Sequence, residues 1–432
     1  MGCPLFKPEP TSFLKVCSIH PRRLTPSGSF EEQLGKAKSS IVASTIPKSI
    51  IYHEKEDAYK FELSIVFFKK HVYYIVSMRT PRIEIDLSKI THNVKNLTQL
   101  FGSKGISIVG VTKGVCGDPK IAKLYLNNGV KIIGDSRIAN FRRMQEADIQ
   151  APFLLLRLPS LSEIESVVKY TDISLNSEIE VISEISRVAS SNNTKHKIIF
   201  MVELGDLREG IMPSDLDDVV KKVIELPGVT LAGLGVNLAC IGGVKPDDKN
   251  MNRLSELAQS IEDKFGLRLE FVSVGNSSVY LWVESAADVG KINNARLGES
   301  LLLGGKDLDG IGIPGLYKDA FTLVAEVIES REKPSVPYGE IMVDAFGDIP
   351  EFEDRGQIRR IILGVGRQDV LFSGLTPRLN IEILAASSDH LILDAKEVDL
   401  KVGAEVEFDV DYGAMLAAMT SPYVAKKYLN EE

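Results

Sequence analysis

Cysteine is scarce in this chain of 432 residues, and the four that occur, Cys3, Cys17, Cys116 and Cys240, lie far apart. They form no CxxC pair, and the six histidines are equally dispersed, so no metal-type spacing is present. This pattern argues against a disulfide-rich secreted domain and against a structural metal site. The simplest interpretation is a cytoplasmic protein with reduced thiols and no bound metal.

Long apolar runs are also missing. The nearest candidate for a membrane span, Phe61–Met78, is interrupted by Lys69, Lys70 and His71, whereas a spanning helix needs about 20 apolar residues. Three prolines and two charged residues within the first ten positions interrupt the apolar core that a secretory signal requires. Neither a membrane span nor a signal peptide is expected.

The sequence has no excess of basic residues. Its net charge of -8 argues against a general nucleic-acid binder, which usually carries a basic face. Hydrophobic residues at 44% and charged residues at 25% are typical of a globular protein, and the length allows two or three domains.

What the sequence does contain is a distinctive stretch at Ile106–Asp118, ISIVGVTKGVCGD. Its apolar first half is typical of a strand buried on both faces, and Lys113 stands at the strand's end, before Gly114. A buried unpaired ammonium is costly, and lysine is the side chain that forms Schiff bases. The alternative is a lysine that merely ends the strand and reaches solvent.

From Pro81 the pattern becomes regular. Eight strands are predicted from Ile106 on, with a helix after each of the first seven, and the last strand is predicted at Ala295–Leu303. Eight evenly spaced strand–helix units predict an α/β protein with a (β/α)8 TIM barrel, which we place at residues 78–312. Residues 1–77 are predicted to be an extension, poorly ordered or accessory, with β-like patches at Ser49–Tyr52 and Phe61–Val76; they could also lie upstream of a true start at Met78.

Residues 313–432 have a different character. Short β-like segments separated by glycine, proline and aspartate predict an all-β C-terminal domain, and the strand Ile83–Asp86 is a candidate to join it. The predicted strands are Ala320–Ser330, Glu340–Asp344, Arg359–Val365, Glu382–Ala385, Leu391–Asp394 and Glu405–Val410.

The active site of a barrel lies at the carboxyl ends of its strands. The turn after strand seven reads GNSS and contains Asn276 and Ser277, and the turn after strand eight reads RLGE and contains Arg296 and Gly298. Small residues in such turns let backbone N–H groups approach a phosphate closely. A plain helix cap would look similar. Strand one neighbours strand eight on closure, so Lys113 would face this cradle. A Schiff-base lysine beside a phosphate site suggests pyridoxal 5'-phosphate.

Arg296 would then face the pyridine nitrogen of that cofactor. Because an arginine cannot give up its proton, the ring should stay unprotonated, which favours proton transfer over decarboxylation or transamination. An ion pair between Arg296 and Glu299 is the alternative.

Nine passages resemble the fold-type III pyridoxal-phosphate enzymes of the alanine racemase superfamily, and most closely its alanine/ornithine racemase branch. They are VGVTKGVCGDP (Val109–Pro119), DISLNSE (Asp172–Glu178), GDLREGI (Gly205–Ile211), GNSS (Gly275–Ser278), ARLGES (Ala295–Ser300), DAFGD (Asp344–Asp348), GRQDV (Gly366–Val370), SSDH (Ser387–His390) and DYGAMLAAMTSPYV (Asp411–Val424). The resemblance covers residues 81 to about 428.

The resemblance implies roles for particular residues. Lys113 is similar to the lysine that binds the cofactor covalently, and Arg208 to the arginine on the side of its phenolic oxygen. Asn276, Ser277 and Gly298 are similar to phosphate ligands, and Arg296 to the partner of the pyridine nitrogen. It also implies a homodimer in which the β domain of one subunit completes the barrel mouth of the other.

One departure from alanine racemase matters for the chemistry. Racemisation with two bases needs a proton acceptor on each face of the substrate. Phe346, in AFGD, stands where the resemblance places the second base, a tyrosine. The candidates that remain are Tyr412, Cys116 and His390, unless a single lysine serves both faces or the reaction differs.

The sequence therefore predicts a racemase that removes the α-proton of an amino acid held on pyridoxal phosphate. A basic substrate such as ornithine or lysine would need a carboxylate for its distal ammonium, and Asp344, Asp348 and Asp369 are candidates. Arg367 could meet the α-carboxylate. The alternatives are alanine racemase proper, a cofactor carrier without turnover, which would usually be a bare barrel, and a lyase or aldolase, which would usually bring a histidine–cysteine metal pair.

Overall fold

The computed structural model describes residues 62–68, 71–77, 80–305, 312–343, 346–347, 349 and 351–431. The chain divides into two units, Met1–Ser77 and Met78–Glu432. In the first unit, β1 (Glu62–Phe68) and β2 (His71–Ser77) form an antiparallel pair, within the second of the two β-like patches. The first patch, Ser49–Tyr52, lies outside the described residues.

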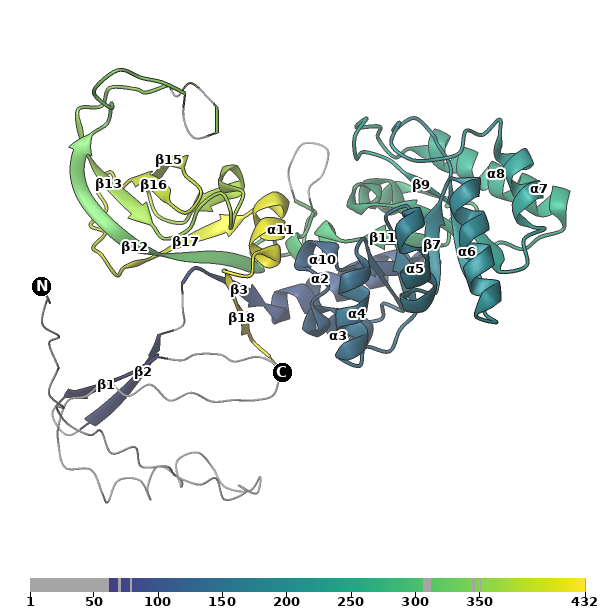
Figure 1. The fold of residues 1–432 in the computed structure, drawn as a ribbon, viewed down its shortest axis with the longest axis horizontal. Coiled ribbons are helices and arrows are strands. Elements are labelled where there is room, and N and C mark those ends of the chain that lie inside the picture. The colour runs from purple at the N-terminus through teal and green to yellow at the C-terminus, as the bar shows by residue number, and fades with distance from the viewer. Residues whose placement is uncertain are drawn as a thin grey trace, which may run out of the picture. The chain divides into compact units, whose positions relative to one another are not determined.

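The second unit contains a closed barrel of eight parallel strands, as the sequence predicts (Figure 1). In chain order the strands are β4 (Ser107–Val111), β5 (Ile132–Asp135), β6 (Phe153–Leu155), β7 (Ile173–Asn176), β8 (His196–Met201), β9 (Val229–Asn237), β10 (Phe271–Gly275) and β11 (Asn294–Leu297). Each strand pairs with the next, and β11 closes the ring against β4 in a register that places Leu297 beside Gly110.

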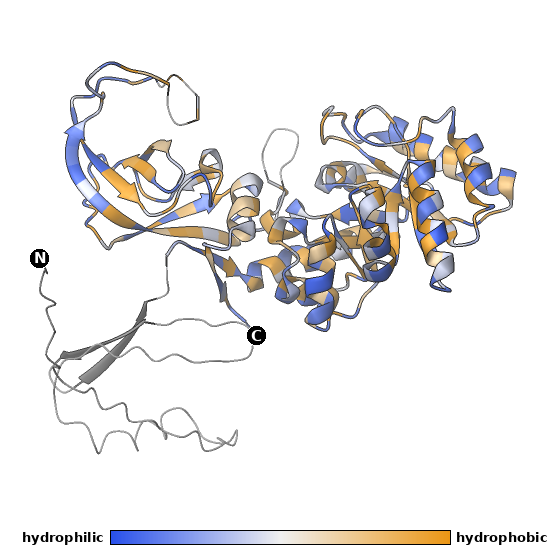
Figure 2. Ribbon diagram, in the orientation of Figure 1, coloured by the Kyte–Doolittle hydropathy of each residue, from blue (hydrophilic) through white to orange (hydrophobic). Residues whose placement is uncertain are grey.

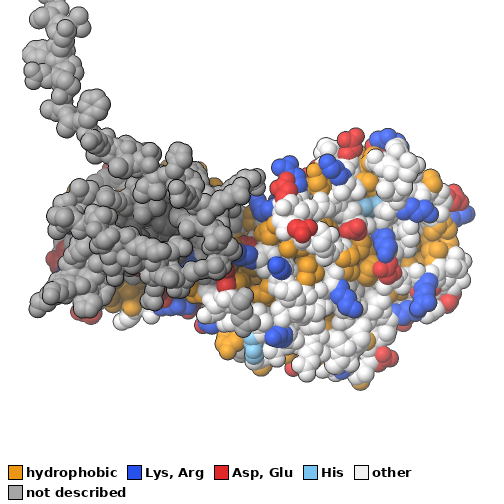
Figure 3. Space-filling model, turned by 90° about the horizontal axis from the view of Figure 1, so that it is seen from below, with side chains coloured by type: hydrophobic (Ala, Val, Ile, Leu, Met, Phe, Trp, Pro, Cys, Tyr) orange, Lys and Arg blue, Asp and Glu red, His pale blue; other side chains and the backbone are white. Residues whose placement is uncertain are grey.

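Helices alternate with these strands around the outside. They are α2 (Leu87–Ser103), which precedes the first barrel strand, and then α3 (Pro119–Asn127), α4 (Ile138–Glu146), α5 (Ile164–Tyr170), α6 (Ile179–Ser191), α7 (Leu216–Val223), α8 (Asp248–Phe265), α9 (Tyr280–Ser285) and α10 (Glu299–Leu303). Most carry an apolar stripe toward the strands and a polar face outward (Figure 2). On the face drawn in Figure 3, acidic and basic side chains are interspersed over the barrel helices.

The predicted last strand, Ala295–Leu303, is only half correct. The strand β11 ends at Leu297, and residues 299–303 form the short helix α10. Gly298, with φ -132° and ψ -71°, turns the chain out of the strand at this point. The apolar run continues through Leu301–Leu303 because the helix is buried as well, and a short apolar run does not distinguish a strand from a buried helix.

The C-terminal part of the unit is a sheet that is antiparallel except for the parallel pair β3–β18, so the prediction of an all-β domain after the barrel is confirmed. Its strand order is β14-β17-β12-β13-β16-β15, and β3 pairs with both β12 and β18. The strands are β3 (Arg82–Asp86), β12 (Phe321–Pro334), β13 (Gln357–Leu363), β14 (Leu375–Pro377), β15 (Glu382–Ala386), β16 (Leu391–Asp394), β17 (Glu405–Val410) and β18 (Ala425–Leu429); one helix, α11 (Tyr412–Thr420), lies between the last two.

The long strand β12 organises this domain, and it runs through it as the long green arrow of Figure 1. Its first half lies between β17 and β3, and its second half pairs with β13 beyond an irregularity at Val327/Glu329. The predicted participation of Ile83–Asp86 is thus confirmed. The predicted strand Glu340–Asp344 is wrong at residues 340–343, which are exposed and irregular; Gly339, at φ +113°, turns the chain immediately before them.

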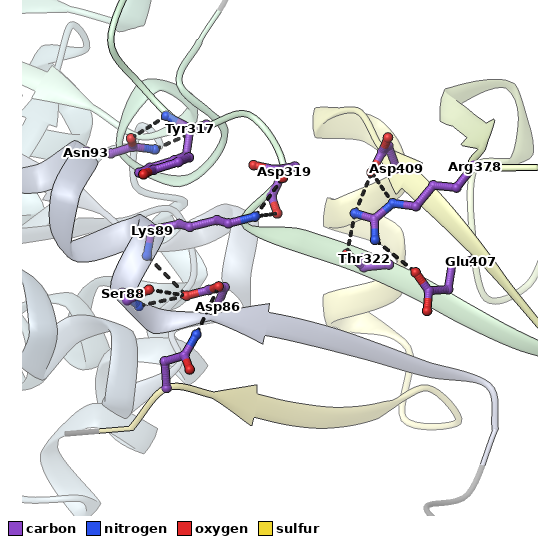
Figure 4. Close-up of polar contacts among 11 residues, drawn as sticks. Asp86, Ser88, Lys89, Asn93, Tyr317, Asp319, Thr322, Arg378, Glu407 and Asp409 are labelled. Carbon is purple, nitrogen blue, oxygen red and sulfur yellow. Dashed lines mark hydrogen bonds and ion pairs between the residues drawn. The ribbon is translucent and has the colours of Figure 1, made fainter.

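The segment that connects the barrel to the β domain is held against helix α2 by polar contacts (Figure 4). Asn93, a buried residue of α2, donates to the carbonyl of Tyr317 and accepts from its N–H, both at 2.8 Å. Lys89 forms an ion pair with Asp319 at 2.6 Å. The cap of α2 is Asp86, whose carboxylate accepts from the N–H groups of Ser88 and Lys89.

One buried histidine lies at the opposite end of the barrel from the strands' carboxyl ends. His196, the first residue of β8, is 2% exposed and shares a hydrogen bond with Ser174 at 2.9 Å. Burial lowers the pKa of His196 to about 4. The folded protein therefore keeps this imidazole neutral at pH values where the unfolded chain protonates it.

This pKa shift predicts a pH-dependent stability. Because the unfolded state binds the extra proton, the stabilisation is complete above pH ~6.5 and is lost as the pH falls toward 4, by roughly 3 kcal/mol. Urea unfolding at pH 7 and pH 4 would show this loss in the wild type. The decrease in the free energy of unfolding between pH 7 and pH 4 should be smaller by roughly 3 kcal/mol in His196→Gln. Equal decreases in the two proteins would show that His196 does not cause the pH dependence.

Candidate active site

A cavity of about 940 Å³ opens at the carboxyl ends of the barrel strands. Its wall contains side chains from the ends of β4, β8, β9, β10 and β11, together with one residue of the β domain, Tyr412. Of the sequence-predicted site residues, it brings together Lys113, Arg208, Asn276, Ser277, Arg296, Gly298 and Tyr412.

Lys113 opens into this cavity from the short 3-10 turn that follows β4. Its side chain is accessible through the cavity mouth, yet protein surrounds it on the other sides. Burial lowers the pKa of the Lys113 amine, and the charge of Arg208 lowers this pKa further. Cys240 and Asp135 raise it, but the net shift is downward. More of this amine is therefore uncharged near neutral pH than in an exposed lysine, as a nucleophile or base requires.

A buried carboxylate supports the backbone next to Lys113. Asp135, at the end of β5, is fully buried and accepts from the hydroxyl of Thr112 at 2.8 Å and from the amide of Asn140 at 2.9 Å. The carbonyl of Thr112 in turn accepts from the N–H groups of Val115 and Gly117. This network fixes the turn that carries Lys113.

Arg208 approaches from the loop after β8. Its guanidinium forms an ion pair with Glu209, which raises the pKa of Arg208, and donates from Nη1 to the Sγ of Cys240 at 2.7 Å. The side-chain amide oxygen of Asn237, turned toward this arginine, accepts from Nη1 of Arg208 at 3.2 Å and from Nη2 at 3.3 Å. Arg208, Glu209 and Cys240 thus form one polar group on the wall of the cavity.

Arg296, on β11, is 5% exposed and points along the inner wall of the barrel. It donates to the hydroxyl of Ser273 at 2.7 Å and to the carbonyl of Val236 at 2.8 Å, rather than to Glu299, the alternative partner. Burial lowers the pKa of Arg296 to about 10, so the group remains a cation at neutral pH.

The turns after β10 and β11 form a small cradle. Asn276 accepts from the N–H of Ser278, and the hydroxyl of Ser277 accepts from the N–H of Ser300, both at 2.9 Å. The hydroxyl of Ser278 is buried without a hydrogen-bond partner in the described part of the chain. A polar atom of this kind beside a cavity points to a ligand that would satisfy it.

Tyr412 begins helix α11, which packs on the turn that carries Lys113. A Cβ added to Gly114 would lie 3.1 Å from the ring of Tyr412 and 3.1 Å from the Cε of Met415, so glycine at this position favours the close approach. Burial raises the pKa of Tyr412 to about 12. The tyrosine therefore lies on the same wall of the cavity as the lysine.

The remaining predicted residues lie apart from the cavity within this chain. Asp369 is buried and accepts from Ser421 at 2.8 Å, and Arg367 stacks on the ring of Phe346 at 3.8 Å. Asp344 and Asp348 lie outside the described residues. Of the other candidates for a second base, Cys116 lies 3.3 Å from Arg143, and His390 lies 3.1 Å from Asp389 in the β domain.

Sequence reasoning missed Asp135, Glu209 and Cys240. Asp135 ends β5 in the motif IIGD, a position at the carboxyl end of a strand that could have been counted with the others. Glu209 directly follows Arg208, where an exposed pair is the ordinary interpretation. Cys240 lies three residues beyond β9, and only the loop's path returns it to the cavity.

Comparison with known proteins decides the family. A sequence model of the alanine racemase N-terminal domain matches residues 85–304. The chain belongs to the alanine racemase family. Among other members, it is 40% identical to the ornithine racemase of Acetoanaerobium sticklandii, over 81% of this chain and 99% of that protein. It is 38% identical to the lysine racemase of Thermotoga maritima, over 81% of this chain and 98% of that protein.

Solved structures of the family agree in fold. The alanine racemase of Clostridium difficile 630 superposes with a TM-score of 0.66 at 18% identity, over 82% of this chain and 98% of that one. This similarity establishes the barrel and the β domain as the alanine racemase architecture. Among the described residues, no helix is long and apolar enough to cross a membrane, and no group of three or more metal-ligating side chains occurs.

The packing at Gly275 leads to a test of the cradle. An added Cβ would collide with the Nη2 of Arg296 and lie 2.9 Å from the side-chain amide of Asn237. We expect Gly275→Ala to lower the free energy of unfolding by about 1–3 kcal/mol, because overpacking displaces a buried arginine. Urea unfolding measures this effect.

A matched control is Gly102→Ala, which adds a Cβ in helix α2 with no heavy atom of the described residues within 4 Å. This substitution should stabilise the protein by up to about 1 kcal/mol, because alanine has the higher helix propensity. If Gly275→Ala behaved like Gly102→Ala, the described packing around Arg296 would be wrong.

Proposed function

We propose that this chain is a pyridoxal-phosphate-dependent racemase that interconverts the L- and D-forms of a basic amino acid, ornithine or lysine. The observation that carries the proposal is the convergence of Lys113, Arg208 and Arg296 on one cavity beside a small polar cradle. The extensive similarity to an ornithine racemase and a lysine racemase supports both the reaction and the substrate class.

The cavity suits this cofactor in size, charge and shape. Its volume of about 940 Å³ is within the usual range for cofactor and ligand pockets. The buried hydroxyl of Ser278, which lines the cavity without a hydrogen-bond partner among the described residues, could be satisfied by a small oxyanion. The residues that would hold the cofactor are Lys113, Arg208, Asn276, Ser277, Arg296 and Gly298.

When bound, pyridoxal phosphate supplies the electron sink that makes the α-proton of an amino acid removable. The chain's own residues determine where that proton goes. Burial lowers the pKa of Lys113 from its ordinary value, which favours the uncharged amine that takes up a proton. Arg296 cannot donate its proton, which favours return of a proton to the substrate over competing reactions of the same cofactor.

Arg208 gives the cavity a fixed positive charge for an anionic group of cofactor or substrate. Its ion pair with Glu209 and its bond to Cys240 hold the guanidinium in one orientation. The carboxylates on the described wall of the cavity are Glu209 and Glu299, so they join Asp344 and Asp369 as candidate partners for the distal ammonium of a basic substrate.

The proposed active form is a homodimer. Tyr338 is 92% exposed and Met342 is 77% exposed, and Val343 and Ile349 in the same segment between β12 and β13 are exposed as well. Clustered exposed apolar side chains mark interaction sites. A second copy of the chain would cover these side chains. In such a dimer, Arg367 and Asp369 in the β domain of one copy would approach the barrel of the other.

The reaction can be tested with the cofactor-loaded protein and L-ornithine, L-lysine and L-alanine in deuterium oxide. Loss of the α-proton signal and growth of the D-enantiomer are expected for ornithine or lysine. Lys113→Ala should lower the rate by on the order of 1,000-fold, because it removes the proton acceptor. Lys123→Ala, on the exposed face of α3, is the control and should keep the wild-type rate.

Exchange of L-alanine alone would contradict the substrate class. Cofactor absorbance without exchange on any of the three amino acids would instead indicate a carrier. Wild-type activity of Lys113→Ala would refute the role of this lysine.

The dimer can be tested by analytical ultracentrifugation. The wild type should sediment as a species of twice the chain mass. Met342→Glu should weaken the association at least 10-fold, because a carboxylate buried in the interface without a partner costs more than about 1.4 kcal/mol. Ile224→Glu, at the end of α7 on the outside of the barrel, should leave it unchanged. A monomeric wild type would refute the proposal.

A further inference from the structure

Cys240 lies in the loop after β9 and lines the same cavity as Lys113. Its side chain is exposed to the cavity and accepts a hydrogen bond from the Nη1 of Arg208 at 2.7 Å. It is the cysteine of the described residues that reaches this cavity, since Cys116 faces Arg143 instead. A thiol at this place is available for chemistry on whatever the cavity holds.

The loop that carries Cys240 is firmly held. The buried carboxylate of Asp206 accepts from three consecutive N–H groups, those of Cys240 at 3.2 Å, Ile241 at 3.2 Å and Gly242 at 3.1 Å. Three bonds to one carboxylate fix the backbone of residues 240–242. The thiol is therefore held beside Arg208 by the backbone as well as by its own hydrogen bond.

Cys240 and Lys113 follow strands on different sides of the barrel. In the closed ring, β9 is separated from β4 by β10 and β11 on one side and by β5 to β8 on the other. The loops that carry the two side chains therefore begin on facing sides of the barrel, and both side chains line the cavity between them. Tyr412, in contrast, packs over Gly114, directly beside the lysine.

A racemase needs proton-transferring groups on opposite faces of one carbon atom. Two groups on facing walls satisfy this requirement for a substrate held between them, whereas two groups on one wall do not. A thiol suits the task, because an ordinary cysteine has a pKa of about 8.5 and exchanges its proton readily near neutral pH.

We propose that Cys240 is the second acid–base residue of this enzyme and acts on the face of the substrate α-carbon opposite Lys113. The proposal rests on the racemase function. In one direction, the Lys113 amine takes the α-proton and becomes an ammonium, while the Cys240 thiol gives its proton to the opposite face and becomes a thiolate. One C–H bond breaks and one forms, no electrons are transferred, and water in the cavity returns the proton from Lys113 to Cys240.

The test uses the full-length, cofactor-loaded wild type, Cys240→Ser and Cys116→Ser. L-ornithine and D-ornithine are incubated separately in deuterium oxide. Loss of the α-proton is followed by NMR, and inversion by chiral chromatography. Serine keeps the hydrogen bond with Arg208 but is a far weaker acid, so the substitution removes the proton transfer and retains the packing. Cofactor absorbance of each variant reports whether the site is intact.

We expect Cys240→Ser to racemise at least about 100-fold more slowly than the wild type, with unchanged cofactor absorbance. One enantiomer should still exchange its α-proton without inverting, because Lys113 still serves its face, and the other should not exchange. Cys116→Ser should behave as the wild type.

Three results would overturn the proposal. The first is racemisation by Cys240→Ser within a few-fold of the wild type. The second is an equal loss of exchange for both enantiomers, which would show that the thiol only supports Arg208. The third is a wild type that exchanges none of ornithine, lysine and alanine; then the racemase function itself fails, and the role of Cys240 fails with it.

Discussion

The whole site depends on the hydrogen-bonded closure of the barrel between β11 and β4. These strands lie at opposite ends of the barrel sequence, yet Arg296 is paired with Val109 across the closure. In an open sheet they would form opposite edges. Closure brings the lysine turn beside the polar cradle after β10 and β11, and it also sets Arg208 and Cys240 on the facing wall.

The electrostatics of the cavity depend on whether each cationic side chain has an anionic partner. Arg208 has a carboxylate partner in Glu209 and remains strongly basic. Arg296 is buried among neutral acceptors, and Lys113 lies in the cavity with no ion-pair partner among the described residues, so desolvation lowers the pKa of both. The same cavity therefore offers fixed positive charge for anionic groups and one amine that loses its proton easily.

The β domain contributes to the site through helix α11. The helix packs closely over Gly114 in the lysine turn, and it brings Tyr412 to the cavity wall. The strand β3 ties this domain to the barrel, because it pairs with β12 and leads directly into α2. Barrel and β domain thus act as one unit around Lys113.

The sequence by itself determined the barrel, the all-β domain and the strand ends that carry Lys113, Arg208, Asn276 and Arg296. Periodicity and chain order are sufficient for this, because every parallel strand ends at the same rim. Local pattern was not sufficient at residues 299–303, which form a buried helix, or at residues 340–343, which form an exposed loop, because both segments have the composition of a strand.

Only the tertiary structure decided which side chains face one another across the cavity. The burial of Asp135, the fixed loop at Cys240 and the position of Tyr412 beside the lysine all result from contacts between distant segments. Such contacts depend on the path of each loop and on packing between domains. Neither leaves a periodic signal in the sequence, and for that reason the position of Cys240 opposite Lys113 becomes apparent only in the folded chain.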